Sequence, residues 1–320
     1  MTAAPPVSLL EELARFLQQH PAVREKACIH EVYAPAESVA GISRLGDDCA
    51  AIPDPSTGGH LLFAAEGMLD SFVRDDPWFA GYSAVMVNLS DVAAMGGTPI
   101  AITDVLVTPD MASAEEIWAG MRAASETYGV PIVGGHTTLA KVDSPRLSAA
   151  VLGRAGEELL TSFDAKPGDA LVIAIDMRGT YRGNKPFWNA STGSPPDRLR
   201  GDLALLPQVA ERRLSLAAKD ISNGGIIGTL AMLAHCSGVG AILDLAHLPK
   251  PDEAGWERWL VSFPSFGFLF AVPQPQVAEL AALFASRDLA CAPIGHFTEN
   301  PDLVLTDDSA RVVLDFGLEA

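Results

Sequence analysis

The residues of this sequence with the clearest chemical potential are carboxylates beside glycines and at the ends of expected elements. Asp47 and Asp48 follow Gly46, Glu66 ends a short apolar run, and Asp91 stands in the long apolar segment WFAGYSAVMVNLSDVAAMG. Carboxylate oxygens suit a hard cation such as Mg²⁺, which keeps several waters and often bridges carboxylates to substrate phosphates. The pattern therefore predicts a Mg²⁺ site formed by these four acids.

Each of these acids also has an ordinary interpretation. Asp47 and Asp48 could form a solvated turn, Glu66 a charged strand end, and Asp91 a helix-surface charge, although apolar residues surround it. Asp70 is a further candidate, but it is better explained as a solvated charge. Ten acids and one base, Arg74, lie between residues 45 and 110. We interpret the other six acids there as solvated surface: Asp54, Asp70, Asp75, Asp76, Asp104 and Asp110.

Two glycine-containing segments could bind phosphate. The segment Gly134-Gly135-His136-Thr137-Thr138 is expected to form a turn after a strand that begins at Ile132–Val133. The segment Asp220-Ile221-Ser222-Asn223-Gly224-Gly225 precedes an expected helix, whose exposed N-terminal amides would attract an anion. Ser222 or Asn223 could equally be the N-cap of that helix, and both interpretations stay open.

Composition and missing motifs exclude several classes of function. The chain has 22 basic and 40 acidic side chains, a formal charge of −18, so we expect no binding to nucleic acid or to anionic membranes. It contains no G-x-x-x-x-G-K-[ST], G-x-S-x-G or H-E-x-x-H motif, and its seven histidines lack metal-ligand spacing.

Several features favour a cytoplasmic protein. The four cysteines lie far apart without a C-x-x-C motif, as expected of reduced thiols. The first residues lack the basic and long apolar regions of a signal peptide. Residues 224–243 carry no Asp, Glu, Lys or Arg but contain five glycines, which favours a buried helix over a membrane span.

Periodicity predicts alternating helices and strands, in an α/β (α+β) fold of two domains covering residues 1–160 and 161–320. The expected helices cover residues 8–20, 78–96, 113–128, 203–218, 225–236 and 275–287. The expected strands cover residues 61–65, 99–107, 147–154, 170–175, 240–245, 266–272, 291–296 and 303–305, besides the one that begins at 132.

Residues 178–202 show no hydrophobic periodicity, and we expect a long loop there. It contains the bases Arg182, Lys185, Arg198 and Arg200. They could cover an anionic substrate or belong to a solvated loop, and Phe187 and Trp188 could close the pocket or simply pack.

Together these motifs resemble the aminoimidazole ribonucleotide (AIR) synthetase superfamily, which includes thiamine monophosphate kinase, selenophosphate synthetase and HypE. The matching segments, in chain order, are Gly46–Ala50, Asn88–Pro99, Gly134–Thr137, Asp220–Gly225 and Ser237–Ala241. Three others resemble its subfamily called AIR synthase-related protein: Phe187-Trp188, Leu199–Pro207 and Phe263–Phe268.

The resemblance implies two α/β domains and a homodimer whose N-terminal strands join across a two-fold axis into a barrel. ATP would bind beside the barrel with several Mg²⁺ ions. Carried over by position, the metal ligands are Asp47, Asp48, Glu66, Asp91 and Asp220. The nucleotide-binding residues would be Asn88, Gly134, Gly135, Thr137, Ser222, Asn223 and Gly224, and the catalytic residues His136 and Asp220.

Three positions depart from the pattern of thiamine monophosphate kinase. Glu66 replaces an aspartate, His136 replaces the acid of Gly-Gly-Asp, and Asn223 replaces the second acid of Asp-Ile-Ser-Asp-Gly. The last two changes remove two negative charges, and a neutral histidine is a poor Mg²⁺ ligand. Residues 263–268 also lack the acids found in the kinase, so thiamine phosphate is a doubtful substrate.

We therefore expect an ATP- and Mg²⁺-dependent enzyme that phosphorylates a small molecule, or activates its amide or carbonyl oxygen. The substrate could be anionic. His136 could contact phosphate, act as an acid or base, or be structural. The alternative is a non-catalytic nucleotide-binding or scaffold protein that has lost part of its metal site.

Overall fold

The computed structural model describes residues 8–29, 45–307 and 310–316 and divides into two compact units. The five-stranded unit comprises Ser38–Leu160 and Ser191–Arg213. The seven-stranded unit comprises Met1–Glu37, Thr161–Ala190 and Leu214–Ala320. Of the described residues, 8–29 group with the seven-stranded unit and Ser191–Arg213 with the five-stranded unit.

The five-stranded unit is built on one mixed sheet with strand order β1-β2-β5-β3-β4. Its strands are β1 (Ala50–Asp54), β2 (Gly59–Gly67), β3 (Thr98–Thr108), β4 (Ile132–Leu139) and β5 (Arg146–Ala155). All neighbours pair antiparallel except β3 and β4, which are parallel and joined by a helix. That connection suits a parallel pair, which needs a long crossover.

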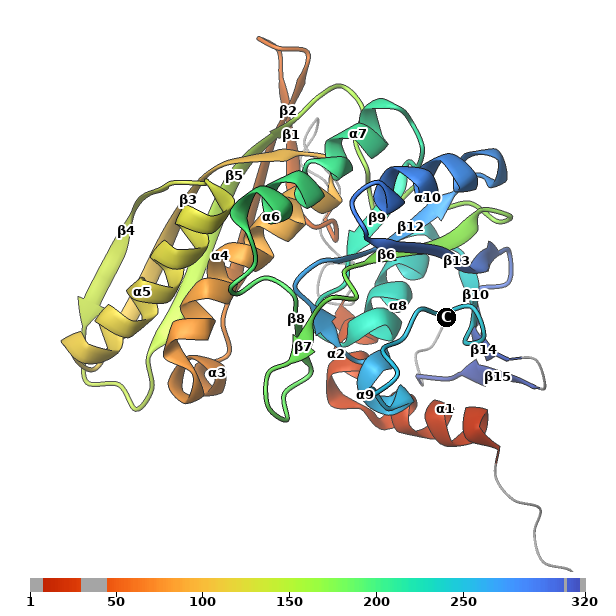
Figure 1. The fold of residues 1–320 in the computed structure, drawn as a ribbon, viewed down its shortest axis with the longest axis horizontal. Coiled ribbons are helices and arrows are strands. Elements are labelled where there is room, and N and C mark those ends of the chain that lie inside the picture. The colour runs from red at the N-terminus through yellow and green to blue at the C-terminus, as the bar shows by residue number, and fades with distance from the viewer. Residues whose placement is uncertain (1–7, 30–44, 308–309, 317–320) are drawn as a thin grey trace, which may run out of the picture. The chain divides into compact units, whose positions relative to one another are not determined.

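Two long helices cover one face of this sheet, α4 (Pro77–Ala94) and α5 (Met111–Tyr128), as Figure 1 shows. Nearly every residue of α4 from Phe79 onward is buried, because the helix lies between the sheet and other helices. The shorter helices of this unit are α3 (Asp70–Asp75), α6 (Pro196–Leu203) and α7 (Leu205–Glu211).

The opposite face of the five-stranded sheet carries exposed apolar side chains. Phe63 and Val105 are each 50% exposed, and Leu152, which pairs with Phe63, is 38% exposed. Strands β1 and β4 are the two edges of the sheet. Within the described part of this unit the sheet is open, so the chain by itself does not form the closed barrel that the resemblance implies.

The seven-stranded unit contains a mixed sheet with strand order β15-β14-β10-β13-β6-β12-β9. Its strands are β6 (Ala170–Ile175), β9 (Ala217–Asp220), β10 (Gly240–Asp244), β12 (Gly267–Val272), β13 (Ala290–Thr298), β14 (Leu303–Thr306) and β15 (Arg311–Leu314). Every residue of β6 and β12 is buried. The reason is that both faces are covered, one by α8 (Gly225–Ser237) and the other by α10 (Val277–Ala285), whose Phe284 packs on Phe270.

Three further helices complete this unit: α1 (Leu9–Gln19), α2 (Pro21–Cys28) and α9 (Trp256–Leu260). The Ser8 hydroxyl accepts from the Glu11 amide and the Glu11 carboxylate from the Ser8 amide, a reciprocal cap that starts α1. The 13-residue α8 confirms the expected buried helix. None of the helices in the described residues has the length and apolarity to cross a bilayer.

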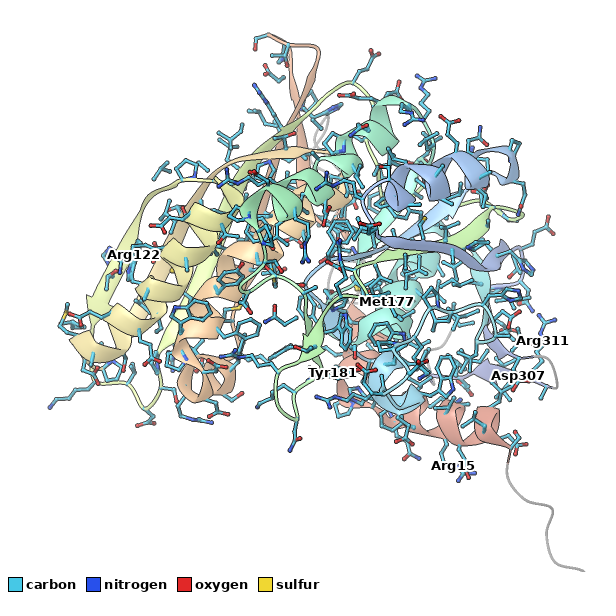
Figure 2. All side chains as sticks on the ribbon, viewed as in Figure 1. Arg15, Arg122, Met177, Tyr181, Asp307 and Arg311 are labelled. Atoms are coloured by element: carbon cyan, nitrogen blue, oxygen red, sulfur yellow. The ribbon has the colours of Figure 1, made fainter. Side chains whose placement is uncertain are left out.

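The expectation of a long loop over 178–202 is wrong. The segment forms β7 (Thr180–Tyr181), β8 (Phe187–Asn189) and the start of α6; β7 and β8 join β11 (Phe263–Pro264) in a small sheet. Trp188 is 2% exposed, its indole donates to the Asp176 carbonyl, and its ring meets those of Tyr181 and Trp259 edge-on. Tyr181, labelled in Figure 2, also lies under the Arg258 guanidinium, 3.5 Å from its ring centroid. Trp188 therefore packs in the core.

The single helix expected over 203–218 is also wrong. The chain instead forms α7, which ends at Glu211, and then β9 from Ala217. Arg213 has a φ of 51°, a left-handed conformation that a helix cannot continue through. Ser215 then donates to the carbonyls of Ala217 and Ala271, which directs the chain into the sheet.

The packing of α4 against α5 generates a prediction about stability. A Cβ atom on Gly120 would overlap the Trp78 carbonyl oxygen of α4, so Gly120→Ala must separate the helices. Overpacking typically costs about 1–3 kcal/mol, and we expect at least that loss in the free energy of unfolding by calorimetry or denaturant titration. The control is Gly156→Ala, whose Cβ would meet nothing within 4 Å. Equal stability of the two variants would contradict this account of the interface.

Candidate metal and nucleotide site

Two of the predicted acids come together in the five-stranded unit. Asp91 lies on α4 and is 6% exposed, while Asp48 is partly buried and precedes β1. A carboxylate oxygen of one lies within 4.8 Å of a carboxylate oxygen of the other. Asp47 forms the adjacent turn, where its Oδ1 accepts from the Asp48 amide at 3.1 Å. Two carboxylates so close together repel each other unless positive charge lies nearby.

Asn88 lies one turn before Asp91 on α4 and is fully buried. Its side-chain nitrogen donates to the Ala84 carbonyl at 2.8 Å, which holds the amide in place. Its Oδ1 has no hydrogen-bond partner among the described residues. A buried acceptor without a donor costs about 1–3 kcal/mol, so this oxygen is a suitable ligand for a cation or a donor group.

The residues present fit a hard cation. Asp48 and Asp91 supply two neighbouring carboxylates, and Asn88 adds an unpartnered carbonyl oxygen from the same helix as Asp91. Mg²⁺ prefers oxygen ligands and takes one or two carboxylates together with water and phosphate oxygens. The helix is buried along most of its length, and it holds Asn88 and Asp91 at a fixed spacing.

Glu66 and Asp104 occupy the helix-facing side of the same sheet. Glu66 pairs with Ala149 of β5, Ala149 pairs with Asp104 of β3, and Asp104 pairs with Gly135 of β4. Residues paired directly across strands project to the same face. Glu66 is exposed near the end of β2, whereas Asp104 is 3% exposed.

Asp104 is the acid that sequence reasoning missed. Burial raises its pKa, and neither carboxylate oxygen has a hydrogen-bond partner among the described residues. Our interpretation of Asp104 as solvated surface is therefore wrong. The alternation along β3 carried the signal, since Ile102, Asp104, Leu106 and Thr108 are its inward positions.

The Gly134–Thr138 segment is a strand and not the expected turn. It lies within β4, which pairs in parallel with β3. The register of this pair places Gly135 opposite Asp104. A Cβ on Gly135 would overlap the Asp104 carboxylate and lie 2.7 Å from the Asp104 carbonyl oxygen. Glycine is therefore needed there for close packing. Thr137 is the next inward position of this edge strand.

His136 points to the other face of the sheet. It pairs with Val105, is exposed, and its Nε2 lies 3.0 Å from the Thr138 hydroxyl. The helix-facing side, covered by α4, holds Asp104 and Glu66 instead. Within this unit, His136 is thus separated from those acids by the thickness of the sheet.

Asp220 belongs to the seven-stranded unit, where it ends β9 and is 4% exposed. Its carbonyl accepts from the Thr229 hydroxyl, which in turn accepts from the Ser222 amide. Gly224, with a φ of 87°, is the N-cap of α8, and no side chain caps this helix. Neither Ser222 nor Asn223 therefore has the alternative role of N-cap.

The four bases proposed to cover a substrate are divided between the two units. Arg200 donates from Nε to the Thr127 carbonyl and from Nη2 to the Glu126 carbonyl, so it caps the C-terminus of α5. Arg198 donates to the Ser194 hydroxyl. Arg182 and Lys185 belong to the β7–β8 hairpin of the seven-stranded unit.

Known proteins match both halves of this chain. Residues 46–155 match the N-terminal domain, and residues 183–308 the C-terminal domain, of AIR synthase related protein. An uncharacterised protein of Synechocystis sp. is 47% identical over 264 residues, which cover 82% of this chain and 80% of that protein. Thiamine-monophosphate kinase of Escherichia coli is 29% identical over 304 residues, which cover 85% and 89%.

A solved structure supports the fold. PurL of Thermotoga maritima, complexed with ATP, superposes with a TM-score of 0.73 at 18% identity, covering 97% of this chain. This chain spans about half the length of that protein, since the match covers 52% of it. The expected mixed α/β fold of two domains is thus confirmed. The chain belongs to the AIR synthase related protein family.

Proposed function

We propose that this protein is an ATP- and Mg²⁺-dependent enzyme that phosphorylates a small molecule or activates its amide or carbonyl oxygen. The observation that carries the proposal is the pair of carboxylates of Asp48 and Asp91, whose oxygens lie within 4.8 Å. Relatives named as a kinase and as an ATP complex support the use of ATP. Their own substrates are not assigned to this chain.

In the proposed site, Asp47, Asp48, Glu66 and Asp91 hold Mg²⁺, and Asn88 contributes its buried oxygen. Bound Mg²⁺ would neutralise the charge that develops on a transferring phosphoryl group. The acids orient the nucleotide through fixed positions on α4 and at the ends of β1 and β2. Such preorganised charges need no rearrangement during the reaction.

Asp220, in the seven-stranded unit, is kept as a candidate metal ligand and catalytic residue. Its backbone is fixed by pairing with Phe268, and the Thr229 hydroxyl holds the turn that follows. We also keep Ser222, Asn223 and Gly224 as nucleotide-binding candidates, because no side chain satisfies the N-terminus of α8.

The sequence and the structure say least about the small molecule that would accept the phosphoryl group or be activated. His136 and Asn223 stand where thiamine monophosphate kinase carries acids, so the site has two fewer negative charges. This favours a small acceptor other than thiamine phosphate. It also supports the second candidate function, a nucleotide-binding protein without turnover.

The first prediction for this site concerns Asp91. Asp91→Asn removes one carboxylate while keeping the shape of the side chain, so we expect Mg-ATP affinity to fall by roughly tenfold or more, about 1.4 kcal/mol for each factor of ten. Isothermal titration calorimetry measures the affinity, and circular dichroism checks the fold. Asp75→Asn, at an exposed ion pair with Arg74, is the matched control. Unchanged affinity in Asp91→Asn would remove this residue from the metal set.

The second prediction separates the two candidate functions. With Mg²⁺, the enzyme should convert ATP to ADP in the presence of one member of a panel of small metabolites, and EDTA should abolish the conversion. Detection of ADP by a coupled assay, with mass spectrometry of the acceptor, shows whether a phosphoryl group is transferred. Binding of Mg-ATP without turnover of any acceptor would favour the non-catalytic protein, and absence of binding would refute both.

The open face of the five-stranded sheet supports a homodimer. It presents Ile52, Phe63, Val105 and Leu152, all at least 37% exposed, on four strands. Phe63 pairs directly with Leu152, whereas Val105 lies opposite Ser148, farther along β5. Exposed apolar surface on an open sheet face suits an interface. We propose that a second copy covers this face, which is the arrangement that would complete the expected barrel.

This homodimer yields a third prediction. Phe63→Lys places a charge on the proposed interface, and burying an unpaired charge is costly, so the dimer should dissociate into monomers. Size-exclusion chromatography with light scattering measures the mass. Met111→Lys, on an exposed residue at the start of α5, should leave the dimer intact. A wild-type protein that is monomeric at micromolar concentration would overturn the proposal.

A further inference from the structure

In the five-stranded unit, the carboxylate of Asp104 is buried without a compensating group among the described residues. It is 3% exposed in the middle of β3, and neither oxygen has a hydrogen-bond partner in that part of the chain. Burial raises the pKa of this carboxyl, and no neighbouring base of the described residues lowers it. An isolated buried carboxylate is costly unless a donor or a positive charge reaches it.

The neighbours of Asp104 on the helix-facing side supply no second carboxylate for a metal ion. Ile102 and Leu106, the adjacent inward positions of β3, are fully buried, and Ala149 pairs with Asp104 from β5. Mg²⁺ keeps several waters when it binds to one or two carboxylates, and apolar neighbours do not hold such waters. A ligand that brings its own hydrogen-bond donors suits this position better than a bare metal ion.

The carboxylate of Asp104 lies toward one edge of the sheet. It leans over Gly135, where a Cβ atom would overlap Oδ1 and lie 2.8 Å from the carboxylate carbon. Gly135 belongs to β4, the last strand of the sheet, and is exposed. Because glycine has no side chain, position 135 places none between the carboxylate and this edge.

A hydroxyl group accompanies the carboxylate at the same edge. Thr137 pairs with Leu106, so its side chain projects to the same helix-facing side as that of Asp104, at the next inward position of β4. Thr137 is exposed, whereas Asp104 is buried. The two carboxylate oxygens and the threonine oxygen offer three acceptors, which match the three N–H donors of a primary ammonium group.

We propose that Asp104 and Thr137 bind a primary ammonium group at the β4 edge, either that of a small amine or the free ammonium ion. The positive charge of the ligand offsets the buried carboxylate, and its N–H groups supply the missing hydrogen bonds. The formal charge of −18 favours the approach of a cation. This site needs neither nucleotide nor Mg²⁺ and therefore does not rest on the proposed function.

NMR of protein labelled at the aspartate carboxyl carbons tests the proposal, with EDTA present and nucleotide absent. The Asp104 signal is identified by its loss in Asp104→Asn. Methylammonium chloride should shift this signal saturably and lower the pKa of the carboxyl, because a bound cation favours the ionised form. Tetramethylammonium chloride at the same ionic strength has no N–H donor and should leave the signal unmoved.

A second variant tests the hydroxyl group. Thr137→Val removes it while keeping the branched shape, so we expect methylammonium binding to weaken by roughly three- to tenfold, the usual effect of losing one hydrogen bond. Asp143→Asn, at an exposed position in the same unit, should bind methylammonium like the wild type. Tighter binding of methylammonium than of ammonium chloride assigns the site to a small amine, and the reverse order assigns it to the free ion.

Thermal unfolding provides a second measurement on the same variants. Methylammonium should raise the Tm of the wild type more than that of Asp104→Asn, since a ligand stabilises only the protein that binds it. If Asp104→Asn does not fold, the exposed Thr137→Val carries the test.

Three outcomes would overturn the proposal. Absence of a saturable shift with both methylammonium and ammonium means that a buried water or a proton satisfies Asp104. An equal shift with tetramethylammonium reduces the effect to non-specific charge, and unchanged binding in Thr137→Val removes the hydroxyl on which the site depends. Mg-ATP binding that depends on Asp91 would leave the proposed function intact in all three cases.

Discussion

The structure of the five-stranded unit depends on burying α4, which packs on the sheet and against its neighbour α5. Glycines at positions 81 and 120 let the two helices approach until side chains larger than hydrogen would overlap backbone atoms of the facing helix. This contact leaves nearly all of α4 without solvent, including Asn88 and Asp91. Polar groups in such surroundings need partners, and the proposed cation would be one of them.

The acidic composition takes on a different meaning once the acids are located. The formal charge of −18 disfavours polyanionic partners, yet several of the acids between residues 45 and 110 are not surface charges. Asp91 and Asp104 are buried on the helix side of one sheet, and Asp70 and Asp75 form exposed ion pairs with arginines. Repulsion among buried carboxylates is strong at low dielectric, whereas the exposed ones are screened. The proposed cation site therefore draws on the buried minority of these acids.

Long segments with a clear hydrophobic period were predictable from the sequence. Short strands that form only by pairing with another strand were not. The helices at 8–20, 78–96, 113–128 and 225–236 and the strands at 170–175 and 266–272 were expected close to their observed bounds, because each has a clear pattern and terminating residues. The Gly134–Thr138 strand and the β7–β8 hairpin lack local strand signals and form by pairing with β3 and β11. Arg200 resembled a substrate-binding residue until its contacts with the end of α5 were known.

The amino-acid sequence alone indicated the family, the α/β class and the alternation of helices and strands, because motif order and local hydrophobic patterns can be recognised without a structure. The same motifs identified the candidate acids Asp47, Asp48, Glu66, Asp91 and Asp220. Only the tertiary structure decided that Asp48 meets Asp91, that His136 faces away from the helices, and that Asp104 is buried beside Gly135. These facts depend on strand register and helix packing. A shift of one residue in register reverses the face of every side chain in a strand, so these placements depend on pairing between strands that lie far apart in the sequence.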